Sequence, residues 1–184
     1  DSMHTQAKGD TLLCFPAAGV KGAMATAALE TAGVNKTSVN RLIFLPQTNI
    51  NIWGKPYLKI DVVRSADMNR TPDMRTRAYL PNWCAEVEIR FATPNFSARS
   101  ISSLVQNAGQ IIGLGDFRQE KGRGSFGTFS IAGEELGEYQ ELWDELMQEG
   151  RAVQELARDN PECADQETAE LMQFLQEERL RRAA

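Results

Sequence analysis

Alternation of apolar and polar residues predicts β-strands in the middle of the chain. Residues 58–64 and 83–91 both change from apolar to polar at every second position, as strands with one face in water do. Residues 75–80 are the expected partner of the first strand, and residues 65–73 between the two are expected to form an exposed loop. A shorter apolar run at 42–45 ends before a proline.

Two segments have the period of helices instead. Residues 17–33 are rich in alanine, begin after a proline and end at a glycine, which predicts a helix with a small-residue face. Ser97 can cap a second helix that runs to Gly113, because its apolar residues recur every three or four positions. Residues 126–131 then alternate again and predict a further strand.

The order of these elements predicts the fold class. Helix, strands, helix and strand make up most of a β-α-β-β-α-β unit, with residues 11–15 as the first strand. We therefore expect an α+β, ferredoxin-like body over residues 1–131, with an antiparallel sheet and helices on one face.

Residues 132–184 differ in character and are expected to form an acidic helical hairpin, with a break at Asn160 and Pro161. The first helix carries an apolar stripe centred on Leu142, Trp143 and Leu146. Such a stripe is too costly to leave in water, so either the body or another chain should cover it. These three residues are the candidate partner-binding residues of the tail.

Composition supports a globular protein and excludes several kinds of site. The 184 residues are 42% apolar and 24% charged, and no window is long and apolar enough for a membrane span. Three widely spaced cysteines suggest reduced thiols in a cytoplasm, and the single histidine, His4, leaves little material for a triad or a zinc site. We therefore expect neither an enzyme nor a bound metal or cofactor.

Charge is divided unevenly along the chain. Residues 1–130 carry a net charge of +5 and residues 131–184 a net charge of −10. This asymmetry suggests a body that binds a polyanion or a tail that binds a partner.

A glycine-rich stretch from Gly113 to Gly127 is the most specific indication of function in the sequence. Glycines allow a loop to approach a phosphate backbone closely, cations neutralise it, and aromatic rings can stack on unpaired bases. The same glycines would also suit a tight connection between a helix and a strand. The loop candidates for nucleic-acid binding are Gly113, Gly115, Phe117, Arg118, Lys121, Gly122, Arg123, Gly124, Phe126 and Gly127.

This stretch resembles the glycine-rich loop of the repeat-associated RNA-binding (RAMP) superfamily of CRISPR effector complexes, in which two glycine-flanked motifs follow the second helix. It is also similar to uncharacterised proteins encoded by phages and prophages, over about residues 12–131. The resemblance implies a ferredoxin-like fold, RNA binding and a location in the bacterial host cytoplasm. RAMP members that cleave RNA use a positioned histidine, and the only candidate here, His4, lies far from this stretch, which favours binding without cleavage.

Two functions follow as hypotheses. The first is non-catalytic binding of single-stranded RNA or DNA, RNA preferred, by the loop and by arginines of the predicted strands, namely Arg64, Arg70, Arg75 and Arg77. The second is a phage protein that acts through protein contacts, as an assembly subunit or an inhibitor of a host factor such as a CRISPR-type defence, with the acidic tail as the interaction element. A homo-oligomer or a larger ribonucleoprotein is compatible with both.

Overall fold

The computed structural model describes residues 4–64, 72–121, 124–132 and 137–183, and its fold is mixed α+β. The chain divides into two compact units. Unit 1 consists of Asp1–Cys14, Asn51–Ala85 and Leu142–Ala184, and unit 2 consists of Phe15–Ile50 and Glu86–Glu141. This grouping differs from the expected division after residue 131, because the C-terminal helices share a unit with the N-terminal segment.

Unit 2 is built around three helices. These are α1 (Ala17–Ala27), α2 (Lys36–Leu42) and α3 (Ala98–Asn107). The strands β2 (Ile43–Phe44) and β6 (Arg90–Phe91) pair antiparallel beside them. Met24, Val39 and Leu104, one from each helix, are fully buried side chains of this unit.

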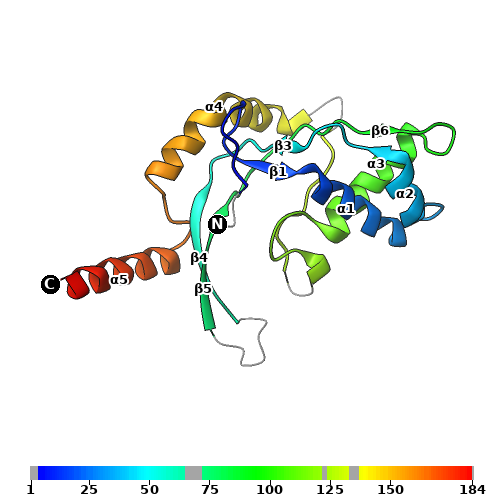
Figure 1. Cartoon of the computed structure of the whole chain (residues 1–184). Coiled ribbons are helices and arrows are strands. Elements are labelled where there is room, and N and C mark those ends of the chain that lie inside the picture. Colours follow the sequence, from blue (N-terminus) through cyan, green and yellow to red (C-terminus); the bar gives the residue numbers. More distant parts are fainter. Residues whose placement is uncertain (1–3, 65–71, 122–123, 133–136, 184) are drawn as a thin grey trace. The chain divides into compact units, whose positions relative to one another are not determined.

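Unit 1 contains a long antiparallel ribbon and two helices (Figure 1). The ribbon pairs β4 (Tyr57–Arg64) with β5 (Pro72–Tyr79) over its full length. The helices are α4 (Gln140–Asp159), whose first two residues belong to unit 2, and α5 (Gln166–Ala183). Two short strands that have residues in both units, β1 (Cys14–Pro16) and β3 (Asn49–Asn51), form a further pair.

Most of the predicted elements are confirmed. The alanine-rich helix, the helix capped by Ser97, the pairing of β4 with β5 and the two tail helices separated at Asn160 and Pro161 all form. The expected loop falls largely on residues 65–71, which lie outside the described residues, while Pro72 and Asp73 belong to β5.

The predicted ferredoxin-like sheet is not among the sheets of the described residues, whose strands form three separate pairs. One reason is visible at the outer edge of β4. The Leu58 amide donates to the Glu162 carbonyl (2.7 Å), the Ala164 amide donates to the Leu58 carbonyl (2.8 Å), and the Ile60 amide donates to the Thr168 hydroxyl (3.2 Å). The chain that leads into α5 thus occupies the edge that another strand would need.

Two of the expected strands are also mostly absent. Residues 83–91 pair only at Cys84, opposite Trp53, and at β6. Between these points the Gln47 side chain takes the place of a neighbouring strand, because its amide donates to the Glu86 carbonyl (3.2 Å) and accepts from the Glu88 amide (2.9 Å). The expected strand at 126–131 makes a single bridge, Phe126 to Arg118.

The tail helices do not pair as a separate hairpin, because each contacts a different part of unit 1. In α4, the Gln154 side chain binds backbone groups of residues 12–13 and 52–54. In contrast, α5 is held at the edge of β4. A glycine with positive φ, Gly150, kinks α4 four residues before Gln154.

Candidate nucleic-acid interface

The glycine-rich loop begins at a firmly held helix end. Ser97 and Ser100 form a capping box at the start of α3, with the Ser100 amide donating to the Ser97 hydroxyl (3.2 Å). Leu104 is fully buried in unit 2, and the helix continues as a π-helical turn over Ala108–Ile112. It ends at Gly113, which has a φ of 74°. The start of the loop is therefore fixed to the core of unit 2.

The loop then folds back on itself. The Leu114 amide donates to the Gly127 carbonyl (2.8 Å), and the Phe126 amide donates to the Phe117 carbonyl (3.3 Å). Farther along, the Phe129 amide donates to the Gly109 carbonyl (3.2 Å). The amides of Leu114, Phe126 and Phe129 are therefore used within the chain and do not face a phosphate.

The two halves of the loop approach each other closely, and this explains why several positions are glycine. A Cβ atom at Gly127 would overlap the Leu114 carbonyl oxygen, and one at Gly124 would overlap the Phe117 carbonyl oxygen. Gly113, Gly115 and Gly127 also have positive φ values, which side chains disfavour. The glycines thus support a tight connection, whichever ligand the loop binds.

Two phenylalanines lie side by side on this loop. The ring centroids of Phe117 and Phe126 are 5.7 Å apart and their planes are inclined by 58°. Phe117 is 54% exposed and Phe126 39% exposed. Phe117 is also held at a φ of 53°, with its amide donating to the Asp116 carboxylate (2.9 Å). The folded loop therefore presents a pair of aromatic rings to solvent.

Arg118, a candidate cation of the loop, is already paired. Arg118 donates to the Glu120 carboxylate (2.7 Å) and to the Gly115 carbonyl (3.0 Å). Sequence reasoning missed Glu120 as this partner, although a carboxylate two residues away was the available signal. Lys121 ends a short 3-10 turn (Gln119–Lys121).

Two further candidates of the loop, Gly122 and Arg123, lie outside the described residues.

A shallow groove of about 230 Å³ lies beside the start of the loop, within unit 2. One side is the small-residue face of α1, including Gly19, Gly22 and Thr26, and the other side includes Arg118 and Glu120. Gly19 and Gly22 are themselves exposed.

The strand arginines belong to unit 1, whereas the loop belongs to unit 2. Arg77 donates to Asp61 (2.9 Å) across the ribbon, and Arg75 donates to Asp73 (3.1 Å). Arg64 ends β4, and Arg70 lies outside the described residues. The structure thus does not bring these candidates and the loop together in one compact unit.

The candidate partner-binding residues of the tail pack within unit 1. Leu146 is buried against Trp53 and Cys84, and Leu142 and Trp143 contact the same cluster. This intramolecular contact is the first of the two alternatives for covering the stripe. Trp143 and its neighbours therefore contribute to the core of unit 1.

Among the described residues, no group of three histidine, cysteine or acidic side chains could hold a metal ion, and no helix has the length and hydropathy to cross a membrane. The three cysteines are thiols, and burial raises the pKa of Cys14. Comparison with protein-family models, curated proteins and solved structures finds no match. The resemblance to the RAMP superfamily therefore stays a prediction.

Proposed function

We propose that the protein binds single-stranded nucleic acid, RNA in preference to DNA, through the glycine-rich loop and without catalysis. The observation that carries this proposal is the exposed Phe117–Phe126 pair. Burying a phenylalanine is worth about 1.5 to 3 kcal/mol, so two neighbouring exposed rings favour a ligand that covers them. Unpaired bases stack on aromatic side chains with about 1 to 3 kcal/mol per base.

Cations close to the rings would contact the phosphates on either side of a stacked base. Arg118 follows Phe117 directly, and Lys121 and Arg123 lie in the same loop. Because Arg118 is bound to Glu120, a phosphate must replace that carboxylate. Glu120 thus acts as an internal competitor that lowers the affinity of the loop for a strand.

RNA is preferred because the loop resembles the RAMP signature. The ferredoxin-like topology that this likeness implies is a further part of the proposal, and the argument from the loop does not depend on it. Contacts from Arg75 and Arg77 would be secondary, since both already have carboxylate partners.

Fluorescence anisotropy with labelled single-stranded RNA and DNA tests this function. We expect Phe117→Ala with Phe126→Ala to weaken binding about 5- to 150-fold for one stacked base. Phe44→Ala is the matched control, because Phe44 is a 55% exposed phenylalanine of unit 2 outside the loop. Absence of binding by the full-length protein at low salt would exclude the proposal.

Charge variants measure the contribution of the cations to binding separately from that of the rings. Replacing Arg118, Lys121 and Arg123 by alanine should weaken the salt dependence of binding. The slope of the logarithm of the binding constant against the logarithm of the salt concentration should become less negative by about two if all three touch phosphate. Glu120→Gln should raise the affinity, because it weakens the bond that holds Arg118. An Arg90→Ala variant, which removes an exposed cation of unit 2 that pairs with Glu88, should bind normally.

Deleting the tail is a poor test of whether its acidic residues compete with the ligand. Truncation after Ile131 would remove Gln154 and Arg151, whose side chains bind the N-terminal segment. Single neutralised carboxylates keep unit 1 intact and are preferable.

A second candidate function, action through protein contacts, is favoured by a separate observation. The outer part of α5 carries exposed apolar side chains, including Phe174 and Leu180. If nucleic acid does not bind, contacts with a partner through these side chains become the main candidate for function.

A further inference from the structure

The two exposed rings of the glycine-rich loop contact each other at an angle. The centroids of Phe117 and Phe126 are 5.7 Å apart and the ring planes are inclined by 58°. A base held between two rings needs parallel planes about 7 Å apart, because carbon atoms in contact are about 3.5 Å apart. No base therefore fits between these two rings, and a base can stack only on an outer face.

The inclination of the rings also limits how a strand can bind. The bases of a stacked run are parallel to one another, so only the end base of a run can lie flat on one ring. A run cannot continue across both rings, because their planes differ by 58°. The pair therefore suits a base with an uncovered face, as bases in loops, bulges and chain ends have.

Phe117 is presented at a cost in backbone conformation. Among the residues that the structure describes, it is the only one other than glycine with a positive φ, at 53°. This left-handed region is unfavourable for a bulky residue, whereas glycine and asparagine enter it more readily. Phe117 is also the more exposed ring, at 54% against 39% for Phe126. Strain of this kind is often found where a side chain is held ready for a ligand.

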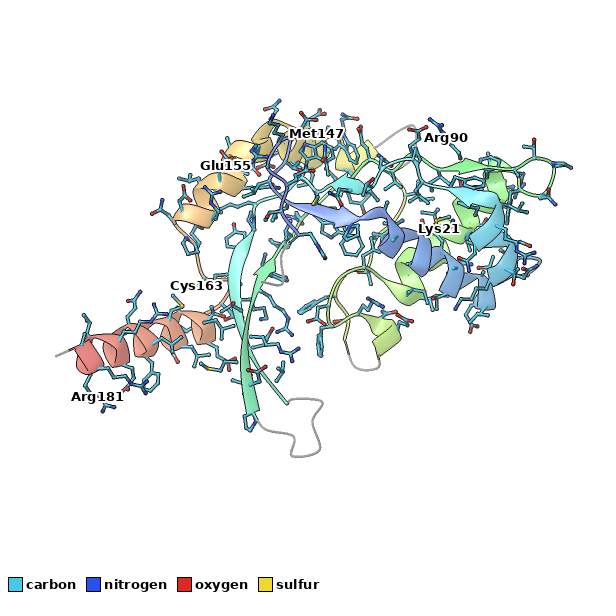
Figure 2. The ribbon with its side chains drawn as sticks, in the orientation of Figure 1. Lys21, Arg90, Met147, Glu155, Cys163 and Arg181 are labelled. Atoms are coloured by element: carbon cyan, nitrogen blue, oxygen red, sulfur yellow. The ribbon has the colours of Figure 1, made fainter. Side chains whose placement is uncertain are left out.

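The surrounding loop holds Phe117 in this conformation. Its amide donates to the Asp116 carboxylate (2.9 Å), and its carbonyl accepts from the Phe126 amide (3.3 Å). Gly124 lies against the same carbonyl, since a Cβ atom there would overlap it. Figure 2 shows the side chains of this loop, which follows α3 in unit 2. The ring is thus positioned in advance, which reduces the entropy lost on binding.

We propose that the loop is a one-base site, in which a single unstacked base covers the outer face of Phe117 while Phe126 and Asp116 position that ring. This inference rests on the proposed function and names its ligand, a strand with an unstacked nucleotide. Arg118 follows the ring directly and is the nearest cation in sequence for the phosphate of that nucleotide. Affinity then depends on the presence of one base and only weakly on the number of bases.

Three labelled RNA octamers test the number of bases by fluorescence anisotropy. The first carries no base on any sugar, the second carries a single central uracil, and the third carries eight uracils. The single uracil should raise the affinity about 5- to 150-fold over the octamer without bases, as one stacked base does. Eight uracils should add at most about a further eightfold, the statistical factor for eight equivalent positions. A much larger further gain would overturn the one-base site.

Substitutions of the two rings assign the base to one of them. Phe117→Leu should remove most of the gain from the single uracil, and the matched Phe126→Leu should keep most of it. Equal losses at the two positions would overturn the assignment to Phe117. Absence of binding by every octamer would exclude the proposed function itself, whereas binding with no gain from the single uracil would overturn only the one-base site.

Two neutral variants test the positioning role of Asp116. Asp116→Ala should lower the gain from the single uracil, and Asp116→Asn should restore it, because the amide oxygen can still accept from the Phe117 amide. Both variants lose the same charge, so electrostatic repulsion of phosphate does not distinguish them. Equal gains in the two variants would overturn this role.

Stability measurements test the strain without any nucleic acid. At a left-handed position glycine is favoured over alanine, whereas elsewhere glycine is the less stable of the two. Urea unfolding followed by circular dichroism should therefore show that Phe117→Gly is more stable than Phe117→Ala, and that Phe126→Gly is less stable than Phe126→Ala. The same order at both positions would contradict the strained presentation of Phe117.

Discussion

The two compact units are stabilised by different kinds of interaction. In unit 2 the fully buried side chains are apolar, as Met24, Val39 and Leu104 show. In contrast, the three buried polar residues of the described chain, Thr11, Gln154 and Thr168, all belong to unit 1. Unit 2 therefore depends mainly on shape and apolar burial, whereas unit 1 also depends on hydrogen bonds between distant segments.

Gln154 shows how the hydrogen bonds of unit 1 work. Its side-chain oxygen accepts from the amides of Leu12 (2.8 Å) and Leu13 (2.9 Å). Its side-chain nitrogen donates to the carbonyls of Ile52 (2.8 Å) and Gly54 (3.0 Å). One side chain of α4 thus joins two segments that are far from it in sequence.

Breaking this junction should have the largest effect on stability. We expect Gln154→Leu to destabilise unit 1 by about 3 to 5 kcal/mol, because buried backbone groups lose their partners. Urea unfolding followed by tryptophan fluorescence measures it, since Trp53, Trp83 and Trp143 all lie in unit 1. Gln173→Leu, at an exposed site of α5, should change stability by no more than about 0.5 kcal/mol.

A glycine substitution tests how far the stability of unit 2 depends on close approach of its backbone segments. Gly127→Ala should destabilise unit 2 by about 2 to 4 kcal/mol, because the added carbon overlaps the Leu114 carbonyl at a positive φ. Gly115→Ala, with a positive φ but open space, should cost only about 1 to 2 kcal/mol. Urea unfolding followed by far-UV circular dichroism measures both, and equal losses would show that close approach is unimportant.

The pH dependence of the contact between α5 and β4 should be the smallest effect. Hydrogen bonds from Lys59 and Thr168 lower the pKa of Asp165, so its contribution is present above about pH 4 and is lost as pH falls further. The hydrogen bond to Asp165 raises the pKa of Lys59, so this cation loses its contribution only above about pH 10. Hydrogen exchange of the Ile60 and Thr168 amides should show reduced protection in acid.

Asp165→Asn is the control for this titration. The variant should show weaker protection of the same amides at neutral pH and little further loss between pH 5 and 3. A full acid transition in the variant would assign the effect to another group.

Patterns within short stretches of sequence predicted much of this structure. Ser97 with the following apolar residues predicted α3, and alternation at 58–64 predicted β4, because both signals depend on local geometry and burial. The seven-residue helix α2 was missed, since it is too short to show a clear period. Asn35, whose side chain accepts from the Ser38 amide, was its one local signal.

The parts that could not be predicted depend on long-range partners. Alternation at 83–91 predicted a strand, but a strand also needs a neighbour, and the Gln47 side chain takes that position. Nothing near Gln154 in sequence indicates that its amide binds residues 12–13. At the candidate site, the loop and its exposed rings were predictable as a motif, whereas the Arg118–Glu120 pair depends on how the loop folds.

The discontinuity of unit 1 has a consequence for biosynthesis. A ribosome completes the last segment of unit 2 before it begins α4 beyond Glu141, so unit 2 can fold while the chain is still being made. Leu12 and Gln154 are 142 residues apart, which corresponds to about 7 to 28 s of translation at 5 to 20 residues per second. During that interval the nascent N-terminal segment lacks its final hydrogen-bonding partner and is open to chaperones.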